Sequence, residues 1–242
     1  MRSRWQAFQR ARQERGYITR YERAIFPLVY LFIYMKWFML LEETKPASYA
    51  IVHTALDDRI PFIEAFVVPY YIWFIYVIAT LIFLFFQRGA EDFYRALFFM
   101  VIGMTFFLVF STLIPTYQPL RPEVMPRDNI FTRTILRLYA TDTPTNVFPS
   151  IHVYNSLACM IALNKTKALD GHRVIRIISS LLSVSIVLST MFIKQHSVID
   201  VAGAFILAFF VYRLIYSSDF IVNLLHIRER EFSLGSSNRS YN

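Results

Sequence analysis

The feature that most constrains this chain is a series of six apolar segments, each close to the length of a helix that crosses a lipid bilayer. Such a helix needs roughly 20 mostly apolar residues to span the hydrocarbon layer. The segments lie at residues 24–41, 62–86, 96–115, 147–163, 174–193 and 199–216. They predict an all-α, polytopic membrane protein built as a six-span helical bundle.

Composition supports a membrane protein and argues against other classes. Hydrophobic residues make up 56% of the 242-residue chain and charged residues 17%, which is too apolar for a soluble domain of this size. The net charge is +8, but the basic residues lie beside apolar segments, where they suit anionic lipid headgroups better than nucleic acid. The single cysteine, Cys159, permits neither an intramolecular disulfide nor a cysteine-rich metal site.

Three regions are expected along the chain. Residues 1–23 interleave arginines with aromatic residues, which predicts a basic amphipathic helix on the membrane surface; a solvated leader is the alternative, and a cleavable signal peptide is not expected. Residues 24–216 form the membrane domain, and residues 217–242 form a partly disordered cytoplasmic tail. The sequence does not predict an oligomeric state.

The distribution of basic residues predicts the orientation of the spans. More than twice as many Lys and Arg flank the spans on the N-terminal side of the bilayer as on the other side, so both termini are expected to be cytoplasmic. The outer side then carries the loops at 42–61, 116–146 and 194–198. In the longest of these, Asp128-Asn129-Ile130 predicts the start of a short outer helix lying against the bilayer surface.

Two of the five histidines fall where chemistry is plausible. His53, His172 and His226 lie in loops or the tail and are interpreted as surface residues. By contrast, His152 and His196 lie at the outer starts of the fourth and sixth spans, so the topology brings them to one membrane face. Taken singly, either could equally be a polar group satisfied at the interface.

The sequence also contains an acidic residue that can orient His196 and two residues that can bind an anion. Asp200 follows His196 by four residues, so on a helix its carboxylate can hold one ring nitrogen and leave the other free to attack or to bind. Arg121 lies between prolines, and Ser150 follows Pro149 at an expected helix start; a guanidinium and a helix N-terminus both suit a phosphate. With no P-loop or clustered metal ligands, we expect phosphoryl chemistry without a metal or another cofactor.

These residues resemble the three signature motifs of the type 2 phosphatidic acid phosphatase superfamily. The motifs are Arg121-Pro122, then Pro149-Ser150-Ile151-His152, then His196 with Asp200, in order over residues 114–203. The resemblance implies that His196 attacks phosphorus to form a phosphohistidine and that Asp200 orients it. It also implies that His152 acts as general acid and base while Arg121 and Ser150 bind the phosphate.

The chain departs from the phosphatase pattern at three positions. Ile114 occupies the place of a lysine, Ser189-Thr190 the place of Ser-Arg, and Ile151 the place of a glycine. Loss of two cations is similar to the phosphotransferase branches, such as inositol phosphorylceramide and sphingomyelin synthases. Lys194 is a candidate replacement for a missing cation; the alternative is a lysine that extends to the headgroups.

The resemblance implies an integral membrane lipid phosphate phosphatase of the phosphatidic acid or prenyl pyrophosphate type. Its alternatives are a lipid phosphotransferase, and a non-enzymatic membrane protein or transporter on the same scaffold. The substrate is expected to be a membrane lipid that reaches a site on the outer side of the bilayer. The expected catalytic residues are His196, His152 and Asp200, and the expected phosphate ligands are Arg121, Ser150 and Lys194.

Overall fold

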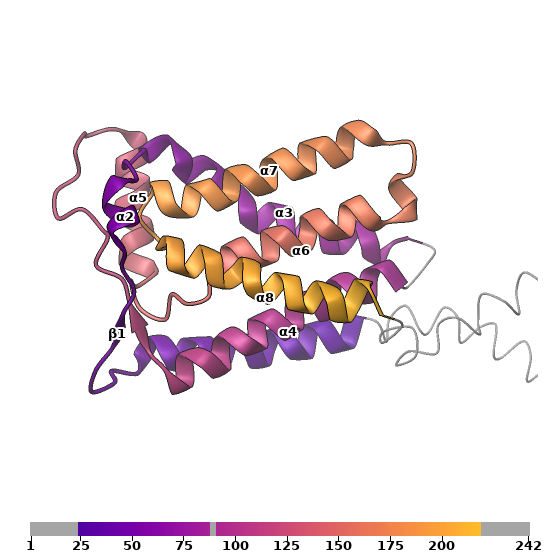
Figure 1. Cartoon of the computed structure of the whole chain (residues 1–242), viewed down its shortest axis with the longest axis horizontal. Coiled ribbons are helices and arrows are strands. Elements are labelled where there is room, and N and C mark those ends of the chain that lie inside the picture. The colour runs from indigo at the N-terminus through magenta and orange to yellow at the C-terminus, as the bar shows by residue number, and fades with distance from the viewer. Residues whose placement is uncertain (1–23, 88–90, 219–242) are drawn as a thin grey trace, which may run out of the picture. The chain divides into compact units, whose positions relative to one another are not determined.

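The structure, a computed structural model, describes residues 24–87 and 91–218 (Figure 1). The chain divides into two compact units, Met1–Glu43 and Thr44–Asn242. Within the described residues the first unit is one 20-residue helix, Ala24–Glu43. The expected amphipathic segment at 1–23 and nearly all of the expected tail at 217–242 lie outside the described residues. The site described below lies in the second unit.

The described residues are mostly helical, and five helices are long and apolar enough to cross a membrane. They are Ala24–Glu43, α3 (Val67–Phe85, with the preceding η1 turn, Glu64–Phe66), α4 (Glu91–Leu113), α7 (Arg173–Phe192) and α8 (Val198–Tyr216). The fourth expected span forms α6 (Ile151–Lys165), a helix of 15 residues that begins four residues later than expected because Ser150 caps it. At that length α6 falls short of a typical span, so six spans remain a prediction.

Helix α6 is the centre of the second unit. It contacts α3, α4, α7 and α8, and Figure 1 shows it running between α7 and α8. Most of its side chains are buried, including the polar His152, Asn155 and Ser156. A helix surrounded by other helices can carry polar residues that a lipid-facing helix cannot, which explains why this segment is the least apolar of the six.

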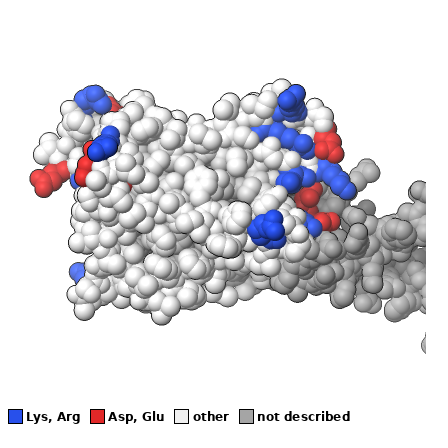
Figure 2. Space-filling model, in the orientation of Figure 1, with Lys and Arg blue, Asp and Glu red and all other residues white. Residues whose placement is uncertain are grey.

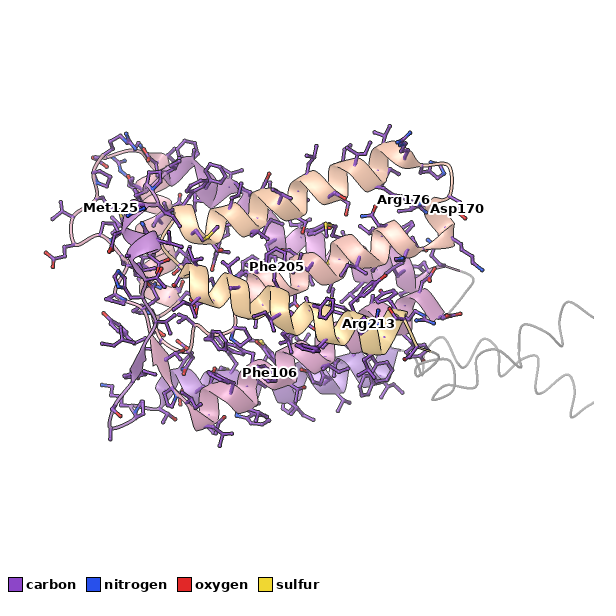
Figure 3. All side chains as sticks on the ribbon, in the orientation of Figure 1. Phe106, Met125, Asp170, Arg176, Phe205 and Arg213 are labelled. Atoms are coloured by element: carbon purple, nitrogen blue, oxygen red, sulfur yellow. The ribbon has the colours of Figure 1, made fainter. Side chains whose placement is uncertain are left out.

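The outer faces of the surrounding helices are apolar. On α7, for example, the exposed residues include Val174, Ile178 and Leu181. On the face shown in Figure 2, charged side chains gather at the two ends of the helices and leave an uncharged surface between them. Figure 3 shows Asp170, Arg176 and Arg213 at the end opposite Met125. This pattern is that of an integral membrane protein, with polar ends and an apolar middle.

Short elements gather at one end of the second unit, which we call the α5 end. Strand β1 (Ala50–Ile51) pairs in parallel with β2 (Thr116–Tyr117), and α2 (Ala55–Arg59) follows β1. Helix α5 (Ile130–Thr141) begins where the sequence predicts, with the Asn129 side chain accepting hydrogen bonds from the amides of Phe131 and Thr132. The other end carries η2 (Lys167–Leu169). The all-α expectation therefore holds except for the two-residue strand pair.

A close helix approach fixes the start of α6. The ring of Phe148, two residues before Ser150, lies 4.8 Å from the ring of Phe110 on α4, measured between centroids. On its other side is Gly203 of α8, where an added Cβ would lie 2.3 Å from Phe148 Cε2. Glycine at this position lets α8 pack directly against the segment that leads into α6.

We therefore expect Gly203→Ala to destabilise the protein by about 1–3 kcal/mol, because the added methyl group must displace the Phe148 ring. The measurement is reversible unfolding in mixed micelles, followed by helical circular dichroism. Ala202→Ser is the matched control, since it adds one heavy atom at the neighbouring exposed position of α8. Equal stability of the two variants would show that this close approach is unimportant.

Candidate functional site

The nucleophile candidate lies in the short turn between α7 and α8. His196 Nδ1 is 3.3 Å from Asp200 Oδ2, and the same oxygen accepts a hydrogen bond of 2.9 Å from the Ser197 amide. Ser197 is the N-cap of α8, and with Asp200 it forms a capping box. Asp200 is fully buried. A carboxylate held in this way fixes the proton of His196 on Nδ1 and leaves Nε2 with a free lone pair.

The second histidine, His152 of α6, lies next to His196, which precedes α8. His152 lies in the first turn of α6, and its Nδ1 is 3.5 Å from His196 Nε2. Two aromatic rings of α3 pack on the His152 ring: Tyr70 at 4.6 Å and Trp73 at 4.4 Å between centroids. The Ser150 amide donates to the Asp200 carbonyl over 3.2 Å, which ties the starts of the two helices together. The structure thus brings together all three expected catalytic residues.

Arg121 enters the site from the loop that follows β2. Its guanidinium donates to the carbonyls of Tyr139 (3.1 Å) and Asp142 (2.6 Å) and to Gln195 Oε1 (2.7 Å), and it stacks over the Tyr139 ring at 4.2 Å. Burial lowers the pKa of Arg121 from its ordinary value, although nearby Asp142 opposes this. Because Gln195 precedes His196 in the turn, these contacts hold the guanidinium beside the nucleophile candidate.

An acidic group that the sequence did not reveal belongs to the same network. The Asp142 carboxylate accepts hydrogen bonds from Tyr70 Oη (3.2 Å) and Gln195 Nε2 (3.1 Å). Burial raises the pKa of this carboxyl above its ordinary value, and the nearby His196 and Arg121 oppose the shift. No motif marks Asp142 or Tyr70. Gln195, which bonds both Asp142 and Arg121, is likewise identified only by the structure.

The structure locates Lys194, the candidate replacement cation, and two of the departures from the phosphatase pattern, Thr190 and Ile114. Lys194 does not point its ammonium toward the histidines; it donates to the carbonyls of Asp57 (2.8 Å) and Ile60 (2.6 Å). Thr190 is buried, and its carbonyl accepts hydrogen bonds from the amides of Gln195 and His196. Ile114 is exposed at the end of α4. None of these three positions brings a cation to the histidine pair.

The two helix starts at the site differ in what they offer an anion. At α8, the Ser197, Val198 and Ile199 amides donate to Asp200, Asp57 and the Ser197 hydroxyl, respectively. At α6, the Ser150 hydroxyl accepts from the Val153 amide at 3.3 Å. The amides of Ile151 and His152 precede the first main-chain hydrogen bond of α6, so they are the donors that remain for a bound group. An anion therefore fits the α6 side of the histidine pair.

Taken together, the site combines two imidazoles, a guanidinium and a helix start, which are the groups that phosphoryl chemistry uses. The exposed His53 and His172 lie elsewhere, as expected, and His226 lies outside the described residues. Over residues 24–87 and 91–218, no three His, Cys, Asp or Glu side chains gather in a way that holds a metal ion.

Comparison with known proteins places the chain in a family. A family model described as the PAP2 superfamily matches residues 36–214, which is more than half of the chain and includes all six expected site residues. No significant match was found among curated proteins or among solved structures. With its apolar helices, the match indicates a membrane protein of the phosphatase and phosphotransferase type. The chain belongs to the type 2 phosphatidic acid phosphatase (PAP2) superfamily.

Proposed function

We propose that the protein is an integral membrane lipid phosphate phosphatase that works through a phosphohistidine on His196. The observation that carries the proposal is the line of contacts from Asp200 to His196 Nδ1 and from His196 Nε2 to His152 Nδ1. It supplies a nucleophile, an orienting acid and a proton donor in one buried cluster, the arrangement that covalent catalysis by a weak nucleophile requires.

In the first step, His196 Nε2 attacks phosphorus and the bond to the leaving oxygen breaks. Protonated His152 gives its proton to that oxygen, so the lipid alcohol leaves neutral. In the second step, neutral His152 takes a proton from water as the water oxygen attacks phosphorus and the P–N bond breaks. Phosphate leaves, and both histidines return to their starting protonation states. Arg121 and the start of α6 stabilise charge on the phosphoryl oxygens.

The substrate in this proposal is a membrane lipid phosphate, of the phosphatidic acid or prenyl pyrophosphate type, and its site faces the outer side of the bilayer. Its support is that His152 lies in the first turn of α6 and His196 directly precedes the N-cap of α8, both at the α5 end of the second unit (Figure 1). A headgroup can reach His196 there while its hydrocarbon chains remain in the bilayer.

A second candidate function is transfer of the phosphoryl group, or of a phosphorylated headgroup, to an alcohol. It is favoured by the positions of Lys194, whose ammonium is bonded to two carbonyls, and of Thr190, which carries no charge. Arg121 then supplies one positive charge beside the pair. One guanidinium matches the single charge of a phosphodiester better than the nearly two charges of a phosphomonoester at neutral pH.

A substrate panel separates the two functions. Purified protein in liposomes is incubated with lipid phosphates, pyrophosphates and phosphodiesters, with and without alcohol acceptors, and each reaction is repeated with a chelator. We expect phosphate release without an acceptor and equal rates with the chelator, because the proposed steps use only protein side chains. Headgroup exchange that requires an acceptor would select the transferase. Failure to turn over any lipid, or loss of activity with the chelator, would overturn the mechanism.

A further inference from the structure

The loop between Glu43 and α3 carries a buried acid that contacts the turn on which His196 lies. This acid is Asp57 of α2, and its exposed fraction is 1%. Its Oδ2 accepts 2.7 Å from the Ser197 hydroxyl, and its Oδ1 accepts 2.8 Å from the Val198 amide. These donors belong to the two residues that directly follow His196.

Asp57 is itself held firmly. The Thr54 amide and hydroxyl donate to its Oδ2 over 2.8 and 3.2 Å, in the capping box of α2. The Lys194 ammonium donates to its main-chain carbonyl. Although burial alone raises the pKa of the Asp57 carboxyl, hydrogen bonds from Ser197, Val198 and Thr54 lower it below its ordinary value. A negative charge therefore sits at the N-terminus of α8, where the helix dipole stabilises it.

Three hydrogen bonds connect Asp57 to His196, through Ser197 and Asp200. Asp57 accepts from the Ser197 hydroxyl, and the Ser197 amide donates to the Asp200 oxygen that holds His196 Nδ1. Other segments hold the turn on its other side: Gln118 Nε2 donates to the Lys194 carbonyl over 3.0 Å, and Tyr139 Oη to the Ile193 carbonyl. Asp57 holds the turn on the side of α8, next to the capping box that Ser197 and Asp200 form.

We propose that Asp57 is a positioning residue. Its hydrogen bonds with Ser197 and Val198 fix the backbone of the turn so that His196 Nε2 points at the phosphoryl group. This role rests on the proposed function of His196. Asp57 does not touch the histidines itself, so it contributes to the rate through geometry rather than through proton transfer. A nucleophile misplaced by about 1 Å can lose on the order of 10²-fold in rate.

The test compares Asp57→Ala and Asp57→Asn with the wild type in full-length protein. Alanine removes both acceptors, and we expect kcat to fall about 10²-fold while KM stays within about two-fold, because the phosphate ligands are untouched. Asparagine keeps one oxygen for the Val198 amide, and we expect it to restore kcat to within about 10-fold of the wild type. If Asp57→Ala does not fold, Ser197→Ala carries the kinetic test, because it removes the hydroxyl that donates to Asp57.

Asp58→Asn is the matched control, because Asp58 is the next residue of α2, its side chain is 65% exposed, and it bonds His53 instead of the turn. It should behave as wild type. Ser197→Ala should lower kcat as well, and combining it with Asp57→Ala should cost less than the sum of the two single losses, since the two residues share one hydrogen bond.

Amide hydrogen exchange gives a second readout that needs no substrate. In the Asp57 variants, exchange should rise in peptides covering residues 194–199 and stay unchanged in peptides covering 205–212. If the wild type turns over its lipid but Asp57→Ala keeps its kcat, or if exchange at 194–199 is unchanged, the positioning role is wrong. If the wild type turns over no lipid, the proposed function fails, and the exchange result alone decides whether Asp57 holds the turn.

Discussion

Replacing His196 with alanine is expected to lower turnover of the lipid substrate by on the order of 10⁴-fold or more, because no other group can form the covalent intermediate. The side chain is largely buried, and its hydrogen bonds are with Asp200 and His152 of the same site, so the helices should assemble as before. Initial rates in liposomes, together with the elution volume in detergent, measure the two effects separately.

His53→Ala is the control for this variant. His53 lies just before α2, is exposed, and its ring bonds the exposed Asp58. It should keep wild-type activity. Activity of His196→Ala within about 10-fold of the wild type, with the fold intact, would mean that another residue attacks phosphorus.

The second large effect is expected from Asp200→Asn, with a loss on the order of 10³- to 10⁴-fold in kcat. One carboxylate oxygen accepts both the Ser197 amide and His196 Nδ1, and the other oxygen is buried without a partner among the described residues. An amide cannot satisfy this arrangement. If the amide oxygen of asparagine faces the Ser197 amide and His196 Nδ1, the negative charge that stabilises the positive imidazole is lost. If the amide nitrogen faces them instead, three donors meet and no hydrogen bond forms.

The measurement is kcat under saturating lipid, with Asp128→Asn as the control for the change of charge. Asp128 lies at the α5 end with a side chain that is 78% exposed, and it pairs with Arg133. Exposed pairs of this kind contribute little, so this control should stay within about two-fold of the wild type. A similar loss in both variants would point to a general electrostatic effect instead of the orientation of His196.

Much of the fold can be predicted from local signals. The start of α5 at Ile130 follows from Asn129, whose side chain caps the first turn, and four of the long apolar segments coincide with α3, α4, α7 and α8. The fourth segment is harder to delimit. Helix α6 is enclosed by other helices, so its composition is set by packing and chemistry rather than by lipid, and apolar content alone sets its boundary too early.

The meeting of His152, His196 and Asp200 can also be predicted, because a helix period and a shared membrane face are properties of sequence and topology. Their catalytic roles remain a proposal. The supports around them cannot be predicted in this way. Asp57 bonds Ser197 across 140 residues and Tyr70 bonds Asp142 across 72, and no spacing rule connects residues so far apart.

The direction of the Lys194 side chain could not be predicted from its position in the sequence. It lies two residues before His196, where a cation could bind phosphate, yet its backbone adopts a left-handed conformation with a φ of 55°. Its ammonium bonds two carbonyls of the α2 loop. In this structure these bonds support the loop that carries Asp57, and phosphate binding by Lys194 stays a prediction. The direction of a long side chain at a turn depends on backbone geometry that sequence pattern does not specify.

The most direct test of the account is to trap the covalent intermediate. Wild-type protein is mixed with a lipid substrate from the panel, labelled in its phosphoryl group, quenched in base during turnover, and digested for mass spectrometry. The account predicts a phosphoryl group on His196 that is stable in base, is lost in acid and is absent from His196→Ala. Turnover with no trapped label, or a label on a residue other than His196, would contradict it.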